Sequence, residues 1–186
     1  MRRALLIAMI GLGCLAWSGP AAADPVRPAR VSDVSGTLSV CSDDEEDEVT
    51  VLDRNRVVRD GDTLWTDRDS HAELELEHGN WIRLAESTKV ESRTLNGGPE
   101  LRLWSGSLYL DLSPRQEREV LLDTPEGDVR IYPDSVVRVD LGADSDARIS
   151  VWSGEARVIP ESGDSERLRS SERVYLNSGR LTDSPH

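Results

Sequence analysis

Two ten-residue stretches of the chain resemble each other: "LRLWSGSLYL" from Leu101 to Leu110 and "ISVWSGEARV" from Ile149 to Val158. Each has apolar residues at alternate positions, then Trp-Ser-Gly, and then a second alternating run. A period of two is typical of a strand with one buried face. Because the apolar phase changes at the Ser-Gly pair, this dipeptide predicts a corner between two strands. The repeat therefore indicates architecture rather than chemistry.

Glycines mark the starts of short alternating runs along the whole chain. They are about 24 residues apart on average, and they are Gly36, Gly61, Gly79, Gly106, Gly127, Gly154 and Gly179. Glycine suits a turn before a strand because it adopts positive φ at no steric cost. Helical periodicity is almost absent, and its best candidate is Asp164–Leu176. The sequence predicts an all-β single domain of stacked short strands, a β-solenoid or a double sheet with rungs of about 24 residues.

The N-terminus has the three parts of a secretory signal peptide. Arg2 and Arg3 precede an apolar run from Ala4 to Trp17, and Ala21-x-Ala23 follows as a cleavage site. The run is shorter than the ~20 residues of a membrane span. We therefore expect cleavage after Ala23, with an uncleaved N-terminal anchor as the alternative. The expected divisions are a signal peptide at 1–23, a linker at 24–30, an all-β domain at 31–181 and a C-terminal tail at 182–186.

The composition is acidic, with 22 basic and 35 acidic residues and a formal net charge of −13. Such a surface disfavours nucleic acids and anionic lipids, whose binding needs clustered Lys and Arg. Cys14 lies within the apolar run, where it does not fit a lipidation site, so the mature chain would have Cys41 alone. A lone cysteine cannot form an internal disulfide, and the domain is therefore expected to hold together by packing.

An ordered series of small motifs runs from Val58 to Val90. A Gly-Asp-x-Leu-x-Thr step precedes an alternating Ala-x-Leu-x-Leu strand, a glycine, an Ile-Arg-Leu strand and a hydroxyl-x-Val strand. In this chain they are Gly61, Asp62, Leu64, Thr66, Ala72, Leu74, Leu76, Gly79, Ile82, Arg83, Leu84, Thr88 and Val90. This order resembles the FecR domain, and the resemblance extends over about residues 31–158.

The resemblance implies a periplasmic all-β stack. In the named FecR regulators, this domain helps to relay a signal from an outer-membrane receptor to a sigma factor. A membrane regulator of that kind would carry a cytoplasmic sigma-binding segment before its span, whereas only residues 1–3 precede the apolar run here. We therefore expect a free-standing exported FecR-like protein in the periplasm or cell envelope of a Gram-negative bacterium. Its expected partner is a protein or an envelope polymer, with no nucleic acid and no cofactor.

Residue patterns that carry catalysis or bind metals are sparse. His71 and His78 bracket an acidic alternating strand, and neither metal-ligand spacings nor a Gly-x-Ser-x-Gly nucleophile elbow occur in the sequence. The acidic run Asp43–Glu48 could gather calcium, but it lacks the alternation and the glycine of a calcium loop. We expect a non-catalytic interaction module without metal ligands. The alternatives are a calcium-dependent surface protein and a polysaccharide-active enzyme with two carboxylates in a groove beside Trp104 and Trp152.

Tryptophans are the best candidates for a binding surface in a chain without phenylalanine. The phase of the repeated stretches places Leu103 and Val151 inward, so that Trp104 and Trp152 lean outward. Exposed aromatic rings bind apolar sugar faces and side chains, whereas packing at a corner of the stack is the alternative role. The candidate partner surface comprises Trp104, Trp152, Trp81, Arg83 and Arg130.

We predict that the exported protein begins at Asp24, because a signal peptidase cuts after a small-x-small site such as Ala21-x-Ala23. The intact mass of protein recovered from the periplasm of a Gram-negative host should equal that of residues 24–186. A mass that still includes residues 1–23 would contradict cleavage and indicate a retained anchor.

Overall fold

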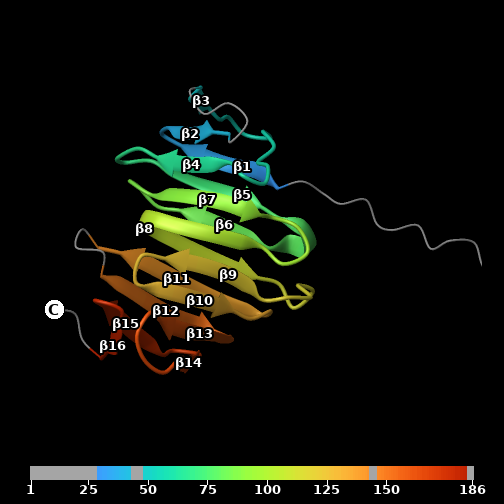
Figure 1. The fold of residues 1–186 in the computed structure, drawn as a ribbon. Coiled ribbons are helices and arrows are strands. Elements are labelled where there is room, and N and C mark those ends of the chain that lie inside the picture. Colours follow the sequence, from blue (N-terminus) through green and yellow to red (C-terminus); the bar gives the residue numbers. More distant parts are fainter. Residues whose placement is uncertain (1–28, 43–47, 143–145, 184–186) are drawn as a thin grey trace, which may run out of the picture.

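A computed structural model describes residues 29–42, 48–142 and 146–183 (Figure 1). The predicted signal peptide, the acidic run as far as Asp47, and His186 lie outside the described residues. The part of the chain that is described contains sixteen strands and one 3-10 turn, Glu77–Gly79, and no α-helix. The Asp164–Leu176 segment, the best helix candidate, forms strands.

The strands form two sheets that share one strand, β8 (Glu100–Leu112). Sheet A contains, in spatial order, β1 (Arg30–Ser35), β5 (His71–Glu75), β6 (Trp81–Leu84), the second half of β8, β11 (Ser135–Leu141), β12 (Ala147–Ser153), β15 (Arg173–Asn177) and β16 (Arg180–Thr182). Sheet B contains β3 (Thr50–Val51), β2 (Leu38–Cys41), β4 (Thr63–Thr66), β7 (Lys89–Thr94), the first half of β8, β9 (Val120–Thr124), β10 (Gly127–Ile131), β13 (Glu155–Pro160) and β14 (Glu166–Arg169).

Neighbouring strands of the described chain are antiparallel in every pair except β8 and β9, which are parallel. The chain advances along the stack, so β1 and β2 lie at one end and β14 to β16 at the other (Figure 1). The prediction of an all-β, stacked double-sheet fold is confirmed. The strands adopt the double-sheet form, since they pair mostly antiparallel, whereas the rungs of a parallel β-helix stack in parallel.

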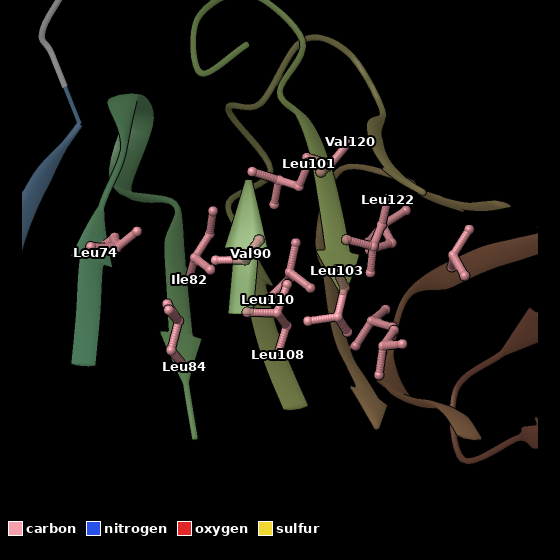
Figure 2. Packing of buried hydrophobic residues seen from close by; sticks show 14 of the residues in the cluster. Leu74, Ile82, Leu84, Val90, Leu101, Leu103, Leu108, Leu110, Val120 and Leu122 are labelled. Atoms are coloured by element: carbon pink, nitrogen blue, oxygen red, sulfur yellow. The ribbon is translucent and has the colours of Figure 1, made fainter. Parts of the chain in front are cut away.

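A single hydrophobic core fills the space between the two sheets. Alternate residues of each strand point inward, as in the β8 pattern of buried Leu101 and Leu103 in sheet B and buried Leu108 and Leu110 in sheet A. Figure 2 shows these leucines packed together with their neighbours from both sheets. Each fully buried leucine contributes about 1.5–3 kcal/mol relative to an exposed one. The core therefore runs along the whole stack and is shared by both sheets.

Three corners between the sheets share one construction, which we call the glycine–hydroxyl corner. At each corner a glycine with positive φ lies against a serine or threonine of the neighbouring crossing, and the backbone N–H after the glycine donates to that hydroxyl. The three donor–acceptor pairs are Thr37 N to Ser70 Oγ (3.0 Å) after Gly36, Ser107 N to Thr88 Oγ1 (2.9 Å) after Gly106, and Glu155 N to Ser135 Oγ (2.9 Å) after Gly154.

The repeated Trp-Ser-Gly stretches build two of these corners. At Gly106 the chain passes from sheet B to sheet A, and at Gly154 it passes from sheet A to sheet B. Leu108 and Ala156 follow the two glycines and are both fully buried in the common core. The two copies therefore have the same local geometry but cross in opposite directions. The four other glycines at predicted turns, Gly61, Gly79, Gly127 and Gly179, also have positive φ.

We predict that Gly106→Ala lowers the free energy of unfolding by about 3 kcal/mol or more in urea denaturation. A Cβ there would lie 2.4 Å from Thr88 Oγ1 and 2.5 Å from Thr88 Cα, in addition to the cost of positive φ. Gly97 is the matched control, because its φ is +74° with open space around a Cβ, and Gly97→Ala should cost about 1 kcal/mol. Thr88→Val should cost about 1–2 kcal/mol, since the Ser107 N–H loses its acceptor. Equal losses for Gly106→Ala and Gly97→Ala would contradict a close-packed corner.

Candidate binding site on the outer face of sheet A

A row of polar and aromatic side chains crosses the outer face of sheet A. Strand register places Arg83, Tyr109, Arg138, Ser150 and Arg173 directly opposite one another on β6, β8, β11, β12 and β15. Each is next to a buried residue on its own strand, so each points away from the core. Side chains that face each other across antiparallel strands lie close enough to interact. The five side chains therefore form one continuous surface drawn from five strands.

Trp152 adds an exposed aromatic ring to this row. It is the extra residue of a β-bulge, because Val136 and Val137 pair with Ser153 and Val151 and leave it without a partner. A bulge re-aims a side chain, and the Trp152 ring meets Tyr109 edge to face, with centroids 6.2 Å apart at 79°. Trp152 is nevertheless 62% exposed. The edge-to-face contact leaves ring surface open for a ligand.

Acidic side chains hold Arg83 against Tyr109. The Arg83 Cζ lies 5.3 Å from the Tyr109 ring centroid. Arg83 Nε donates to Glu73 Oε2 at 2.6 Å, and Arg83 also pairs with Asp111 at 3.7 Å. Ser32 donates to the other oxygen of Glu73 at 2.9 Å, so both oxygens of this carboxylate have partners. Glu73 of the His71, Glu73 and Glu75 strand is therefore an ion-paired carboxylate.

Asp140 fixes two further arginines. Its Oδ1 accepts hydrogen bonds from Ser107 Oγ (2.6 Å) and Arg138 Nε (2.7 Å), and its Oδ2 accepts two from Arg148, one from Nη2 (2.7 Å) and one from Nε (3.1 Å). Burial by itself raises the pKa of the Asp140 carboxyl, but the hydrogen bonds from Ser107, Arg148 and Arg138 outweigh it and hold that pKa below its usual value. The hydrogen bond with Asp140 in turn raises the pKa of Arg148. One carboxylate thus orients two guanidinium groups.

Two hollows lie on this face and adjoin at Arg138, which lines both. The larger, of about 440 Å³, is lined by Arg138, Arg148, Ser150, Trp152, Glu172 and Arg173, among others. The smaller, of about 280 Å³, is lined by Ala85, the Tyr109 ring and Arg138, and by the ion-paired Asp33, Glu73 and Arg83, above the buried Leu84 and Leu108. Within the described part of the chain, the Arg173 guanidinium has no ion pair or hydrogen bond. The face therefore combines a cationic hollow and an apolar one.

The residues of the predicted partner surface are divided between the two sheets. Trp152, Arg83 and Trp81 lie on sheet A, whereas Trp104 lies on the outer face of sheet B, at a bulge of its own. The Trp104 ring is covered by the Arg102 guanidinium, whose Cζ is 3.8 Å from the ring centroid. The groove flanked by Trp104 and Trp152 that a polysaccharide-active enzyme was expected to have is therefore not formed.

Arg130 also lies on sheet B, where it pairs with Glu119 at 3.0 Å. The residues of sheet A that the sequence analysis missed are Tyr109, Arg138, Arg148 and Arg173. Alternation marks Tyr109 and Arg138 as outward residues, because each stands between two buried apolar ones. Their meeting in one row depends on strand order, which alternation does not reveal.

Comparison with known proteins identifies the family. The family model described as "FecR protein" matches residues 62–157, more than half of the chain. This protein therefore belongs to the FecR family, as the resemblance of its motifs indicated. No curated protein sequence matches the chain.

The fold is similar to that of solved structures. Two crystal structures, at 1.65 and 2.50 Å resolution, show a "putative anti-sigma factor" from Parabacteroides distasonis that is 18% identical to this chain, with a TM-score of 0.55. Each match covers 64% of this chain and 57% of the other, so this chain spans little more than half of that protein's length. At this identity the likeness shows a common fold. Residues 29–42, 48–142 and 146–183 include no helix with the length and hydrophobicity of a membrane span.

We predict that Asp140→Asn lowers the free energy of unfolding by about 1 kcal/mol at pH 7. The amide would replace the charged carboxylate that accepts hydrogen bonds from Ser107, Arg138 and Arg148. A carboxyl whose pKa is lowered by folding stabilises above its unfolded pKa and loses that contribution as pH falls through its folded pKa. The difference between wild type and variant should therefore shrink as the pH falls below about 4. Urea denaturation at pH 7 and at steps down to pH 3 measures it, and Asp128→Asn on sheet B is the control. A difference that does not depend on pH would contradict the role of Asp140.

Proposed function

We propose that this FecR-family protein is a non-catalytic binding module that acts in the periplasm or cell envelope of a Gram-negative bacterium. It would bind a partner protein through the outer face of sheet A and serve in envelope sensing or assembly. The observation that carries this proposal is the pair of adjoining hollows on that face. The larger is lined by the exposed Trp152 and by Arg173, whose guanidinium has no partner among the described residues.

A packed sheet that fixes the spacing of its outward side chains suits binding. The core side chains of the five strands are buried between the sheets, so the outward row keeps its spacing without a partner. Preorganised contact groups lose less conformational entropy when a partner binds. Aromatic and arginine side chains are also the types that most often dominate binding energy at protein interfaces. Trp152, Tyr109 and the neighbouring arginines supply both types.

The contrast with sheet B supports the choice of face. On sheet B the Trp104 ring is already covered by Arg102, and Asp123 pairs with Arg93 at 2.9 Å and with Arg102 at 3.4 Å. Groups that satisfy one another within the chain have less to offer a partner. On sheet A the Trp152 ring stays open beside Tyr109.

Export and regulation complete the proposal. The signal-peptide pattern of residues 1–23 supports export, and the domain at residues 31–181 would be the functional unit after cleavage at Ala23. The structurally similar protein is described as an anti-sigma factor. We extend to this chain only the general idea of a regulatory protein that acts by binding another protein.

Photo-crosslinking in intact cells tests the binding face. We expect p-benzoylphenylalanine at position 173, on sheet A, to give a crosslinked species of higher mass than the monomer. The matched control is position 157 on sheet B, because Arg157 is also an exposed arginine without an ion pair among the described residues. Free monomer alone from position 173, or crosslinking from position 157 only, would overturn the proposal.

A further inference from the structure

We infer that the outer face of sheet A binds an acidic peptide segment in which an apolar side chain lies next to a carboxylate. This inference rests on the proposed function of the same face, and it names the chemistry of the partner. It follows from the charge of one hollow, the lining of the other and the arginine that they share.

The larger hollow is locally positive in a chain whose formal net charge is −13. Its lining brings together the guanidinium groups of Arg138, Arg148 and Arg173. Among the described residues, two carboxylates lie close to these three cations. Asp140 pairs with Arg138 and Arg148, and Glu172 lines the same hollow. The Glu172 carboxylate is itself engaged, since its Oε2 accepts the Arg169 N–H at 2.7 Å. One positive charge is therefore left for a ligand.

Arginine is suited to a carboxylate ligand because its planar fork donates two parallel hydrogen bonds. Asp140 holds Arg138 and Arg148 through one edge of each guanidinium, which leaves further N–H groups for a second acceptor. Arg173 can use its whole fork. Complementary charge would also speed the encounter with an acidic partner and repel a basic one.

The smaller hollow takes an apolar side chain. It is lined by Ala85 and the Tyr109 ring above the buried Leu84 and Leu108, and its charged groups Asp33, Glu73 and Arg83 are ion-paired within the chain. Filling such a hollow with a leucine or valine side chain removes apolar surface of both partners from water. Arg138 lines both hollows, so neighbouring residues of one ligand can supply the carboxylate and the apolar side chain.

A peptide explains both hollows better than an anionic sugar polymer does. Sugar rings carry hydroxyl groups that need hydrogen-bond partners, and burying them unpaired costs free energy. The charged groups Asp33, Glu73 and Arg83 that line the hollow are already ion-paired within the chain, and its hydroxyls come only from Ser107 and Tyr109 among the residues described. Ser107 already donates its hydroxyl proton to Asp140 at 2.6 Å. An aliphatic side chain has no polar group to leave unpaired there.

The test is a titration of the ¹⁵N-labelled mature protein with the capped peptide Ac-Glu-Leu-Glu-Asp-Leu-Glu-NH₂, followed by NMR. We expect the Trp152 indole N–H and the Arg173 amide to shift, while the Trp104 indole N–H stays in place. Two matched peptides separate the requirements: Ac-Gln-Leu-Gln-Asn-Leu-Gln-NH₂ lacks the charge, and Ac-Glu-Ser-Glu-Asp-Ser-Glu-NH₂ lacks the apolar side chains. Each should bind at least tenfold more weakly than the Glu-Leu peptide. Added salt should lower the affinity of the two acidic peptides.

Substitutions locate the binding site without relying on the assignment of NMR signals. Arg173→Gln and Trp152→Ala should each weaken binding of the Glu-Leu peptide at least fivefold. Their matched controls on sheet B, Arg157→Gln and Trp104→Ala, should leave binding unchanged. All four side chains are exposed, and an unchanged melting temperature for each variant shows that the fold is retained.

Equal binding of the uncharged peptide would overturn the inference, as would equal effects of the sheet A and sheet B variants. An oligogalacturonate that shifts Trp152 when the Glu-Leu peptide does not would assign the face to an acidic glycan and overturn it as well. Failure of the peptide while position 173 still crosslinks a protein in cells would reject this ligand chemistry and leave the proposed function standing. If the peptide does not bind and position 173 does not crosslink a protein, the ligand chemistry and the proposed function are both rejected.

Discussion

The double sheet depends on the contact between a corner glycine and the hydroxyl of the crossing beside it. At Gly106 the backbone approaches Thr88 so closely that no side chain fits between them, and the freed space lets Ser107 N–H reach the threonine hydroxyl. A chain that changes sheets interrupts its strand pairing and leaves backbone groups without ladder partners. The hydroxyl supplies the missing acceptor. Gly36 and Gly154 repeat the arrangement with serine, so one device serves both crossing directions.

These corners decide what the surface can present. Because each crossing is short and tightly held, the strands on either side keep a strict alternation, and hydrocarbon fills one continuous core. Every second residue is then available on an outer face. The bulges that precede two of the corners turn Trp104 and Trp152 outward. The two rings differ in their surroundings, because the Arg102 guanidinium covers Trp104, whereas Trp152 remains open beside Tyr109 and the arginines of sheet A.

Much of the fold was predictable because it is written in local patterns. Alternation identified Leu103 and Val151 as buried, and the change of phase at Ser-Gly identified the corners. The site was predictable only in part. Trp152 and Arg83 were recognised by residue type, but Trp104 was grouped with Trp152 because the two stretches are alike in sequence. Successive corners cross in opposite directions, so equivalent positions in the two repeats lie on different sheets.

The amino-acid sequence alone determined the strand class, the turn positions, the inward and outward residues and the family, because each depends on residue types close together in the chain. Tertiary structure alone decided which outward residues meet. Arg83, Tyr109, Arg138 and Arg173 come from four strands spread over 91 positions of the chain, and only strand order and register align them. Register is a long-range property set by the whole packed core, since a slip of one residue would turn every apolar side chain to solvent. That is why the binding face became visible only in the folded protein.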